Sequence, residues 1–308
     1  MAALDTEARK LPNFFLVGAM RSGSTSVYYH LLAHPHIYTS RIKEPNYFAT
    51  DLRIPLDRRH RTRLAEAKRG KLNRVRVSDF DEYLGLFEGA SSELAIGECS
   101  VAYLYSKTAA AEIRSMIPHA RILMVLRNPV QRAYSHYLMH VRNAQAKSSF
   151  RDEMNRDLST IDDTGMANPY IETGLYYEQI KRYLGIFPRD QVKIFLTEDM
   201  RDDLYAFLSS LYEFLGVDSS FRPPATIYNE AKVPRSTLLN QLWSKTPLKG
   251  SIVKHLPQSV RDIVESLYNS YNVPKMSEVD REYLITVFAP EIRRLEPLIN
   301  RDLANWLK

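Results

Sequence analysis

The segment that decides the fold reads Phe14-Phe15-Leu16-Val17-Gly18-Ala19-Met20-Arg21-Ser22-Gly23-Ser24-Thr25. An apolar run followed by a glycine-bounded turn and a helical pattern predicts a buried strand, a loop and a helix. Such a turn directs unpaired backbone N–H groups, together with the positive end of the helix dipole, at one point in space. We therefore expect an anion-binding loop, with close backbone approach at Gly18 and Gly23. The side chains expected to contact the anion are Arg21, Ser22, Ser24 and Thr25.

This loop differs from the loops that bind ATP and GTP. The spacing from Gly18 to Gly23 matches the nucleotide P-loop, but Ser24 stands where the P-loop lysine would be. The cation comes earlier instead, at Arg21. The loop also offers no carboxylate to bind magnesium. An ATP-dependent P-loop small-molecule kinase is therefore the weaker alternative.

Apolar runs that predict buried parallel strands alternate with helical patterns along the chain. The predicted strands are residues 14–17, 122–126 and 192–196, with a weaker fourth at 94–96. The predicted helices are residues 24–32, 103–116, 129–141, 176–186 and 203–215. This alternation predicts an α/β fold: a central parallel β-sheet flanked by helices, with P-loop-containing nucleotide-binding architecture. Ligands of such folds bind at the carboxyl ends of the strands.

The chain shows no internal repeat or low-complexity block, so we expect residues 1–308 to form a single domain. Residues 13–220 form its α/β core, which carries a basic insertion at 51–76. Residues 221–308 are predicted to be a mainly helical extension that ends in an amphipathic stretch at 278–306.

The net charge of +6 is concentrated in the basic insertion. Residues 51–76 hold ten Lys or Arg and three Asp or Glu, a net +7, so the remaining chain sums to −1. One basic segment on a near-neutral body indicates local contact with an anionic partner, and a solvated surface loop is the alternative interpretation. Taken alone, the segment also fits a noncatalytic polyanion-binding protein. We expect no nucleic-acid partner, and the sequence gives no oligomeric state.

The single cysteine, Cys99, excludes an intramolecular disulfide and a cysteine-built zinc site. Residues 1–12 are polar, and no apolar run approaches the roughly 20 residues needed to span a bilayer. We therefore expect a cytoplasmic protein without a transmembrane segment. No pair of histidines has a metal-ligand context, so we expect no metal site.

A second segment, residues 121–142, places polar side chains at the end of another predicted strand. It reads RILMVLRNPVQRAYSHYLMHVR, in which Arg127 ends the strand and Asn128 and Pro129 can begin the next helix. Ser135 lies nearly two turns inside that helix. With one phosphate on the first loop, Arg127 and Ser135 can hold a second phosphate of the same ligand. An ordinary salt bridge for Arg127 and a polar helix position for Ser135 are the alternatives.

Four segments together resemble the sulfotransferases that use 3′-phosphoadenosine 5′-phosphosulfate (PAPS). They are GAMRSGST at 18–25, KEPNYF at 43–48, LRNPVQRAYSHY at 126–137 and ETGLYYEQIKRYLGIFPRDQVKIFLTEDM at 172–200. The similarity is greatest to the glycan-modifying, heparan-sulfate-type domains with their KEP-type segment, and to their bacterial relatives. It extends from about residue 14 to about residue 306, because RDLANWL at 301–307 also resembles the family's terminus.

The resemblance implies a cofactor, PAPS, and a role for each matching position. The first loop would bind the 5′-phosphosulfate end through Arg21, with loop contacts from Gly23, Ser24 and Thr25. The second segment would bind the 3′-phosphate through Arg127 and Ser135. Weaker cofactor candidates, in a segment resembling the loop that closes over the nucleotide, are Lys232 and Arg235.

The resemblance also implies the catalytic base. The glutamate of the KEP-type segment takes the proton of the acceptor, and that position is Glu44, with Lys43 beside it. In-line transfer to a hydroxyl or amine then needs no divalent metal, because Arg21 and the loop amides can stabilise the charge on the departing phosphate. The basic segment favours an anionic glycan or glycolipid as acceptor.

One segment departs from the family pattern. The family often has Glu-Lys-Thr/Ser-Pro-x-Tyr after its third strand, whereas this chain has Glu98-Cys99-Ser100-Val101-Ala102-Tyr103. Cys99 cannot replace the lysine, so we expect Lys43 or an arginine of the basic segment to supply the cation. Glu98 is the reserve candidate for the base.

Overall fold

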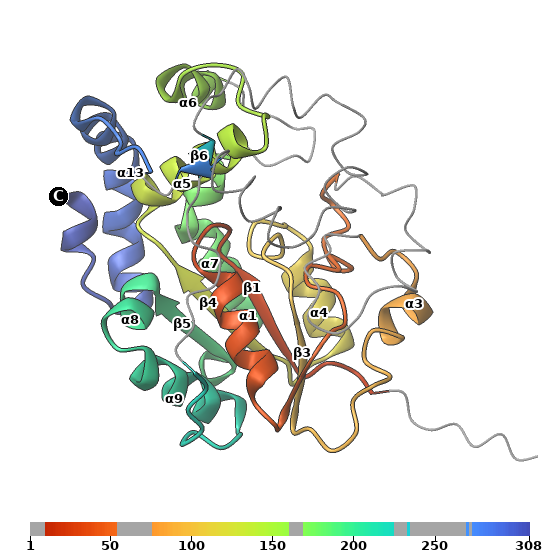
Figure 1. Cartoon of the computed structure of the whole chain (residues 1–308). Helices are drawn as coiled ribbons and strands as arrows, with labels where there is room; N and C mark the ends of the chain where they lie inside the picture. Colours follow the sequence, from red (N-terminus) through yellow and green to blue (C-terminus); the bar gives the residue numbers. More distant parts are fainter. Residues whose placement is uncertain (1–9, 54–75, 160–168, 225–232, 235–268, 271–272) are drawn as a thin grey trace, which may run out of the picture.

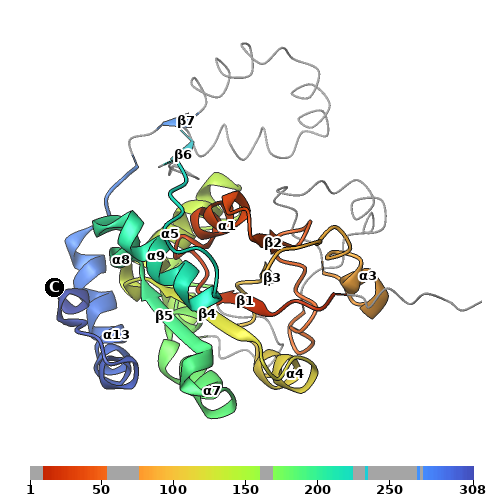
Figure 2. The same cartoon turned by 90° about the horizontal axis from the view of Figure 1, so that it is seen from below.

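The computed structural model describes residues 10–53, 76–159, 169–224, 233–234, 269–270 and 273–308. Its centre is a parallel sheet with the strand order β2-β3-β1-β4-β5 (Figure 1 and Figure 2). The strands are β1 (Phe14–Gly18), β2 (Ile37–Thr39), β3 (Ala95–Cys99), β4 (Arg121–Leu126) and β5 (Val192–Leu196). All residues of the three inner strands except Arg121 are buried, which explains why these strands read as continuous runs without alternation.

Helices cover both faces of this sheet, as Figure 2 shows. On one face, α1 (Ser24–Ala33) and α9 (Leu204–Leu215) bury apolar side chains such as Leu31 and Leu208. On the other face, α4 (Ala109–Met116) and α7 (Tyr176–Ile186) bury Ile113 and Ile180. The predicted α/β fold is confirmed.

The remaining helices surround this core. The long α13 (Glu278–Ile299) packs against α7 and α5, and its buried Phe288 joins the core on that side. The others are α3 (Phe80–Leu84), α5 (Pro129–Arg142), α6 (Phe150–Ser159) and α8 (Thr197–Asp202), with 3₁₀ turns at η1 (Glu172–Gly174), η2 (Arg189–Gln191) and η3 (Ala304–Leu307). No described helix is both long and apolar enough to cross a membrane.

Two element boundaries differ from the sequence prediction. The strand predicted at 94–96 is β3, which runs on to Cys99, and hydroxyl groups satisfy the buried carboxylate of Glu98 within it. The helix predicted from 103 begins only at Ala109, where the Ser106 hydroxyl accepts the backbone N–H of Ala109. In the extension, α13 and η3 confirm a helical end, while β6 (Val233–Pro234) and β7 (Asn269–Ser270) pair antiparallel.

Candidate active site

The loop between β1 and α1 has the geometry of an anion site. Its Gly23 is the N-cap of α1 and has φ +83°, a left-handed conformation that favours glycine. Gly23 has no side chain to cap the helix, so among the described residues no N-cap side chain accepts its first backbone N–H groups. These N–H groups and the positive end of the α1 dipole suit an anion.

Gly18 has a different role from the one expected. A Cβ atom at this position would lie 2.6 Å from the Leu104 Cβ, inside van der Waals contact. Gly18 therefore allows the segment after β3 to pack against the end of β1, where the Leu104 N–H donates to the Val17 carbonyl at 2.8 Å. Position 18 requires glycine because of this packing, whereas Gly23 belongs to the anion loop.

The structure brings Arg21 and Ser135 into direct contact. The Arg21 Nε and Nη2 donate to the Ser135 Oγ at 3.3 and 3.1 Å, and Nη1 lies 3.6 Å from the Met139 Sδ. The Arg127 Nη1 donates to the Arg21 carbonyl at 3.3 Å. The two segments predicted to bind phosphate groups are thus in direct contact. They lie closer together than we expect for side chains that bind opposite ends of one nucleotide. Which phosphate each side chain holds stays a prediction.

Arg127 is positioned by its neighbours in the chain. It follows β4, and Asn128 caps α5 by accepting the backbone N–H of Val130 at 2.9 Å. Burial lowers the pKa of the Arg127 guanidinium, and no carboxylate among the described residues forms an ion pair with it. A half-enclosed cation of this kind, next to Arg21 and a serine hydroxyl, fits the donor set that a phosphate group requires.

Two aromatic residues that the sequence did not single out support this corner. The Tyr176 hydroxyl donates to the Arg127 carbonyl at 3.1 Å. The Trp306 carbonyl accepts Nδ2 of Asn128 at 3.3 Å, and the Trp306 indole donates to Glu198 at 2.9 Å. The only sequence signal for Trp306 was the family-like ending. The C-terminal turn η3 therefore supports the chain directly after β4, where Arg127 lies.

Lys43 and Glu44 form a buried ion pair. The Lys43 Nζ lies 2.7 Å from the Glu44 Oε1, and the two residues are only 4% and 6% exposed. The Glu44 N–H donates to the Cys99 carbonyl at 3.0 Å, which attaches the pair to the carboxyl end of β3. Because β3 is the parallel neighbour of β1, Glu44 lies at the same sheet edge as the anion loop, as predicted.

Glu98 is enclosed rather than presented to a ligand. Tyr83 and Tyr103 each donate to its Oε1 at 2.8 Å, and Ser100 donates to its Oε2 at 2.6 Å. Burial raises the pKa of Glu98 to about 7, although these hydrogen bonds favour the carboxylate. This fully buried group is not placed to accept a proton from an acceptor, which counts against its reserve role as base.

The Cys99 thiol at the end of β3 is uncharged. It is fully buried in the core cluster that includes Leu16 and Val27, and burial raises its pKa. The Lys43 ammonium acts on that thiol electrostatically, so Lys43 is a cation close to the position of the missing family lysine. Lys232, Arg235 and residues 54–75 of the basic segment lie outside the described residues.

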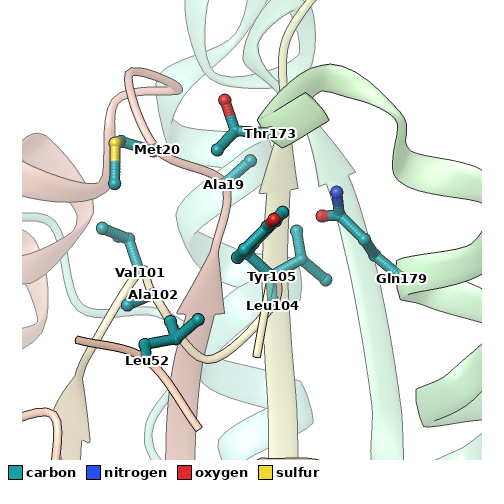
Figure 3. A pocket seen from close by; sticks show the side chains of 9 residues that line it. All are labelled: Ala19, Met20, Leu52, Val101, Ala102, Leu104, Tyr105, Thr173 and Gln179. Carbon is teal, nitrogen blue, oxygen red and sulfur yellow. The ribbon is translucent and has the colours of Figure 1, made fainter. Parts of the chain in front are cut away.

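A mainly apolar cavity adjoins the anion loop (Figure 3). It lies between the loop, the segment after β3, and η1 with α7. Its lining residues are Ala19, Met20, Leu52, Val101, Ala102, Leu104, Tyr105, Thr173 and Gln179. The cavity places an apolar surface next to the residues that are suited to bind an anion.

Comparison with known proteins agrees with this geometry. The chain belongs to the sulfotransferase family, because the family model described as "Sulfotransferase family" matches residues 12–221. A solved sulfotransferase from Alicyclobacillus acidocaldarius superposes with a TM-score of 0.71 at 30% identity, covering 97% of this chain and 100% of that one.

Two curated relatives have names that refer to glycans. Carbohydrate sulfotransferase 15 of Rattus norvegicus is 23% identical over 89% of this chain and 54% of its own length. Bifunctional heparan sulfate N-deacetylase/N-sulfotransferase 4 of Mus musculus is 25% identical over 97% of this chain and 31% of its own length. The chain thus spans about half and about a third of these relatives. The kinase alternative gains no support from these comparisons.

Proposed function

We propose that the protein transfers a sulfuryl group from PAPS to a hydroxyl or amine of a glycan acceptor. The observation that carries this proposal is the meeting, at one sheet edge, of an anion loop, the Arg21–Ser135–Arg127 cluster and the buried Lys43–Glu44 pair. The cluster supplies cations and a hydroxyl for a bisphosphorylated nucleotide. The ion pair supplies a carboxylate for proton transfer. Membership of the sulfotransferase family supports the same chemistry.

PAPS supplies the activated sulfuryl group, and the residues of this chain supply the rest. As the bond from sulfur to the phosphate oxygen breaks, Arg21 and the N–H groups at the start of α1 stabilise the negative charge on the departing phosphate. As sulfur bonds to the acceptor oxygen or nitrogen, Glu44 takes the proton that the acceptor loses. Arg127 and Ser135 hold the 3′-phosphate and so fix the position of the nucleotide.

The anionic acceptor is inferred from charge. The basic insertion at 51–76 gives the chain its positive excess, and both curated relatives described above bear names of glycan-modifying enzymes. A sulfated or carboxylated glycan chain carries negative charge, so this positively charged segment would attract it. A glycolipid with an acidic glycan shares this chemistry.

The decisive experiment incubates the full chain with PAPS and a panel of acidic and neutral glycans. We expect mass spectrometry to show a gain of about 80 Da on an acidic glycan, because that mass is the sulfuryl group delivered by the cofactor. We also expect 3′-phosphoadenosine 5′-phosphate (PAP) to raise the melting temperature, and ATP with magnesium to leave it unchanged. Salt-sensitive glycan binding without mass gain would instead indicate the noncatalytic polyanion-binding protein.

Lys43 offers a second test of the site. We expect Lys43→Met to lower kcat roughly ten- to hundredfold, because a hydrogen bond to a charged group contributes about 1.5–3 kcal/mol. Lys43→Arg should lose less, since it keeps the cation beside Glu44. The exposed Lys107 provides the control, and Lys107→Met should keep the wild-type rate. Steady-state kinetics with PAPS would contradict the role of Lys43 if the Met variant also kept that rate.

A further inference from the structure

The segment that carries Glu44 has an unusual backbone. Glu44 and Asn46 have φ values of +63° and +54°, in the left-handed region that is unfavourable for side chains other than glycine. Asn46 tolerates this region better than Glu44 does. Such a conformation persists only where the surroundings hold it. The contacts of residues 44–48 therefore decide where the Glu44 carboxylate stands.

Two backbone N–H groups of this segment bond to hydroxyl oxygens. The Asn46 N–H donates to the Ser100 Oγ at 3.1 Å, and the Phe48 N–H donates to the Tyr103 hydroxyl oxygen at 3.3 Å. Asn46 also ties the segment to itself, because its Nδ2 donates to the Glu44 carbonyl at 2.7 Å. Two hydroxyl oxygens thus help to hold the segment, beside the backbone bonds from the Glu44 N–H to the Cys99 carbonyl and from the Val77 N–H to the Pro45 carbonyl.

Both hydroxyl groups donate their protons to Glu98. Ser100 donates to Oε2 at 2.6 Å and Tyr103 donates to Oε1 at 2.8 Å. A serine or tyrosine hydroxyl has one proton, so donation to Glu98 leaves the oxygen lone pairs for the backbone N–H groups. An ionised carboxylate accepts only, and it therefore orients both hydroxyls in the same sense.

We propose that Glu98 is a positioning residue for the Lys43–Glu44 pair: its carboxylate orients the Ser100 and Tyr103 hydroxyls, which in turn hold Asn46 and Phe48. This inference rests on the proposed function, because it assigns Glu98 to the presentation of the base. It also accounts for a carboxylate that is fully buried in the sheet and accepts hydrogen bonds from three hydroxyl groups. A neutral side chain there would cost less to bury.

Glu98→Gln is the first test. The amide keeps the volume of the carboxylate but replaces one acceptor oxygen with a donor, so Ser100 or the two tyrosines lose the acceptor that orients their hydroxyl protons. We expect kcat to fall roughly tenfold, the cost of one misdirected hydrogen bond, with the KM for PAPS within about threefold of wild type. The melting temperature at pH 8 should not fall, because burial raises the pKa of Glu98 to about 7 and its charge there costs stability.

A matched pair of tyrosine variants separates positioning from mere packing. Tyr83 and Tyr103 are both fully buried and donate to the same Glu98 oxygen at 2.8 Å. Only the Tyr103 hydroxyl also accepts a backbone N–H of the segment after Glu44. We expect Tyr103→Phe to lower kcat several-fold more than Tyr83→Phe, with the PAP-induced thermal shift kept in both. Ser100→Ala should behave like Tyr103→Phe, and Ser100→Thr, which keeps the hydroxyl, should restore the rate.

Two failures are distinguishable in this design. A wild-type protein that transfers no sulfuryl group would overturn the proposed function. An active wild type beside Glu98→Gln, Tyr103→Phe and Ser100→Ala variants of unchanged kcat would overturn the positioning role alone. Equal losses of kcat in the two tyrosine variants would also overturn it, because packing around Glu98 would then explain the effect.

Discussion

Glu44→Gln is expected to remove nearly all turnover while the protein still binds nucleotide. The substitution keeps the size of the side chain but removes the carboxylate that takes the acceptor proton, and general base catalysis contributes roughly 10²- to 10⁴-fold. Glu44 is nearly buried, and its backbone N–H bonds to the end of β3, so solvent water is poorly placed to replace its carboxylate. Single-turnover assays with PAPS and the glycan acceptor would measure the loss.

Two comparisons make this result interpretable. The loss of charge leaves Lys43 buried without its carboxylate, so the PAP-induced thermal shift must show that the nucleotide site is intact. Glu88→Gln removes an exposed carboxylate that pairs with Arg41 on the surface, and it should keep the full rate. Turnover of Glu44→Gln within about threefold of wild type would move the base to another residue.

The double substitution Lys43→Met with Glu44→Gln refines the assignment. It removes both members of the buried pair, so no uncompensated charge remains inside the protein. If Glu44 is the base, the double variant stays as inactive as Glu44→Gln even where its melting temperature recovers. Recovery of turnover together with stability would mean that the single variant was merely destabilised.

The sequence was sufficient to predict four strands of the central sheet and the edge at which the candidate site lies, but not the short edge strand β2. Strands such as β1 and β4 are buried on both faces, so their continuous apolar runs can be recognised in the sequence alone. Arg127 and Ser135 could be named because a cation at a strand end and a serine inside the next helix stand in one short segment. Residues that lie close together in the chain in this way can be recognised from a sequence pattern.

The geometry around Glu44 could not be predicted in the same way. Its left-handed backbone depends on hydroxyls from Ser100 and Tyr103, more than 50 residues away. Glu98 appeared as a possible base because a glutamate after an apolar run carries no sign of whether its carboxylate is enclosed. The contact between Arg21 and Ser135 depends on the path of a long side chain, which spacing does not specify.

Arg127→Ala is expected to weaken nucleotide binding roughly ten- to hundredfold. A charge-assisted hydrogen bond contributes about 1.5–3 kcal/mol, and 1.4 kcal/mol corresponds to a factor of ten in affinity. The free protein should not lose stability, since burial lowers the pKa of this guanidinium and its removal relieves a desolvation cost. Titration calorimetry with PAP gives the affinity, and thermal melting gives the stability.

The control for Arg127 is an arginine at the opposite edge of the sheet. Arg189 is exposed in η2, directly before β5 begins, so Arg189→Ala removes the same charge without touching the carboxyl ends of the strands. A general electrostatic effect would weaken PAP binding in both variants, whereas a phosphate contact weakens it only in Arg127→Ala. Equal PAP affinity in Arg127→Ala and wild type would remove Arg127 from the nucleotide site, and this half-buried cation would then need another anion to explain it.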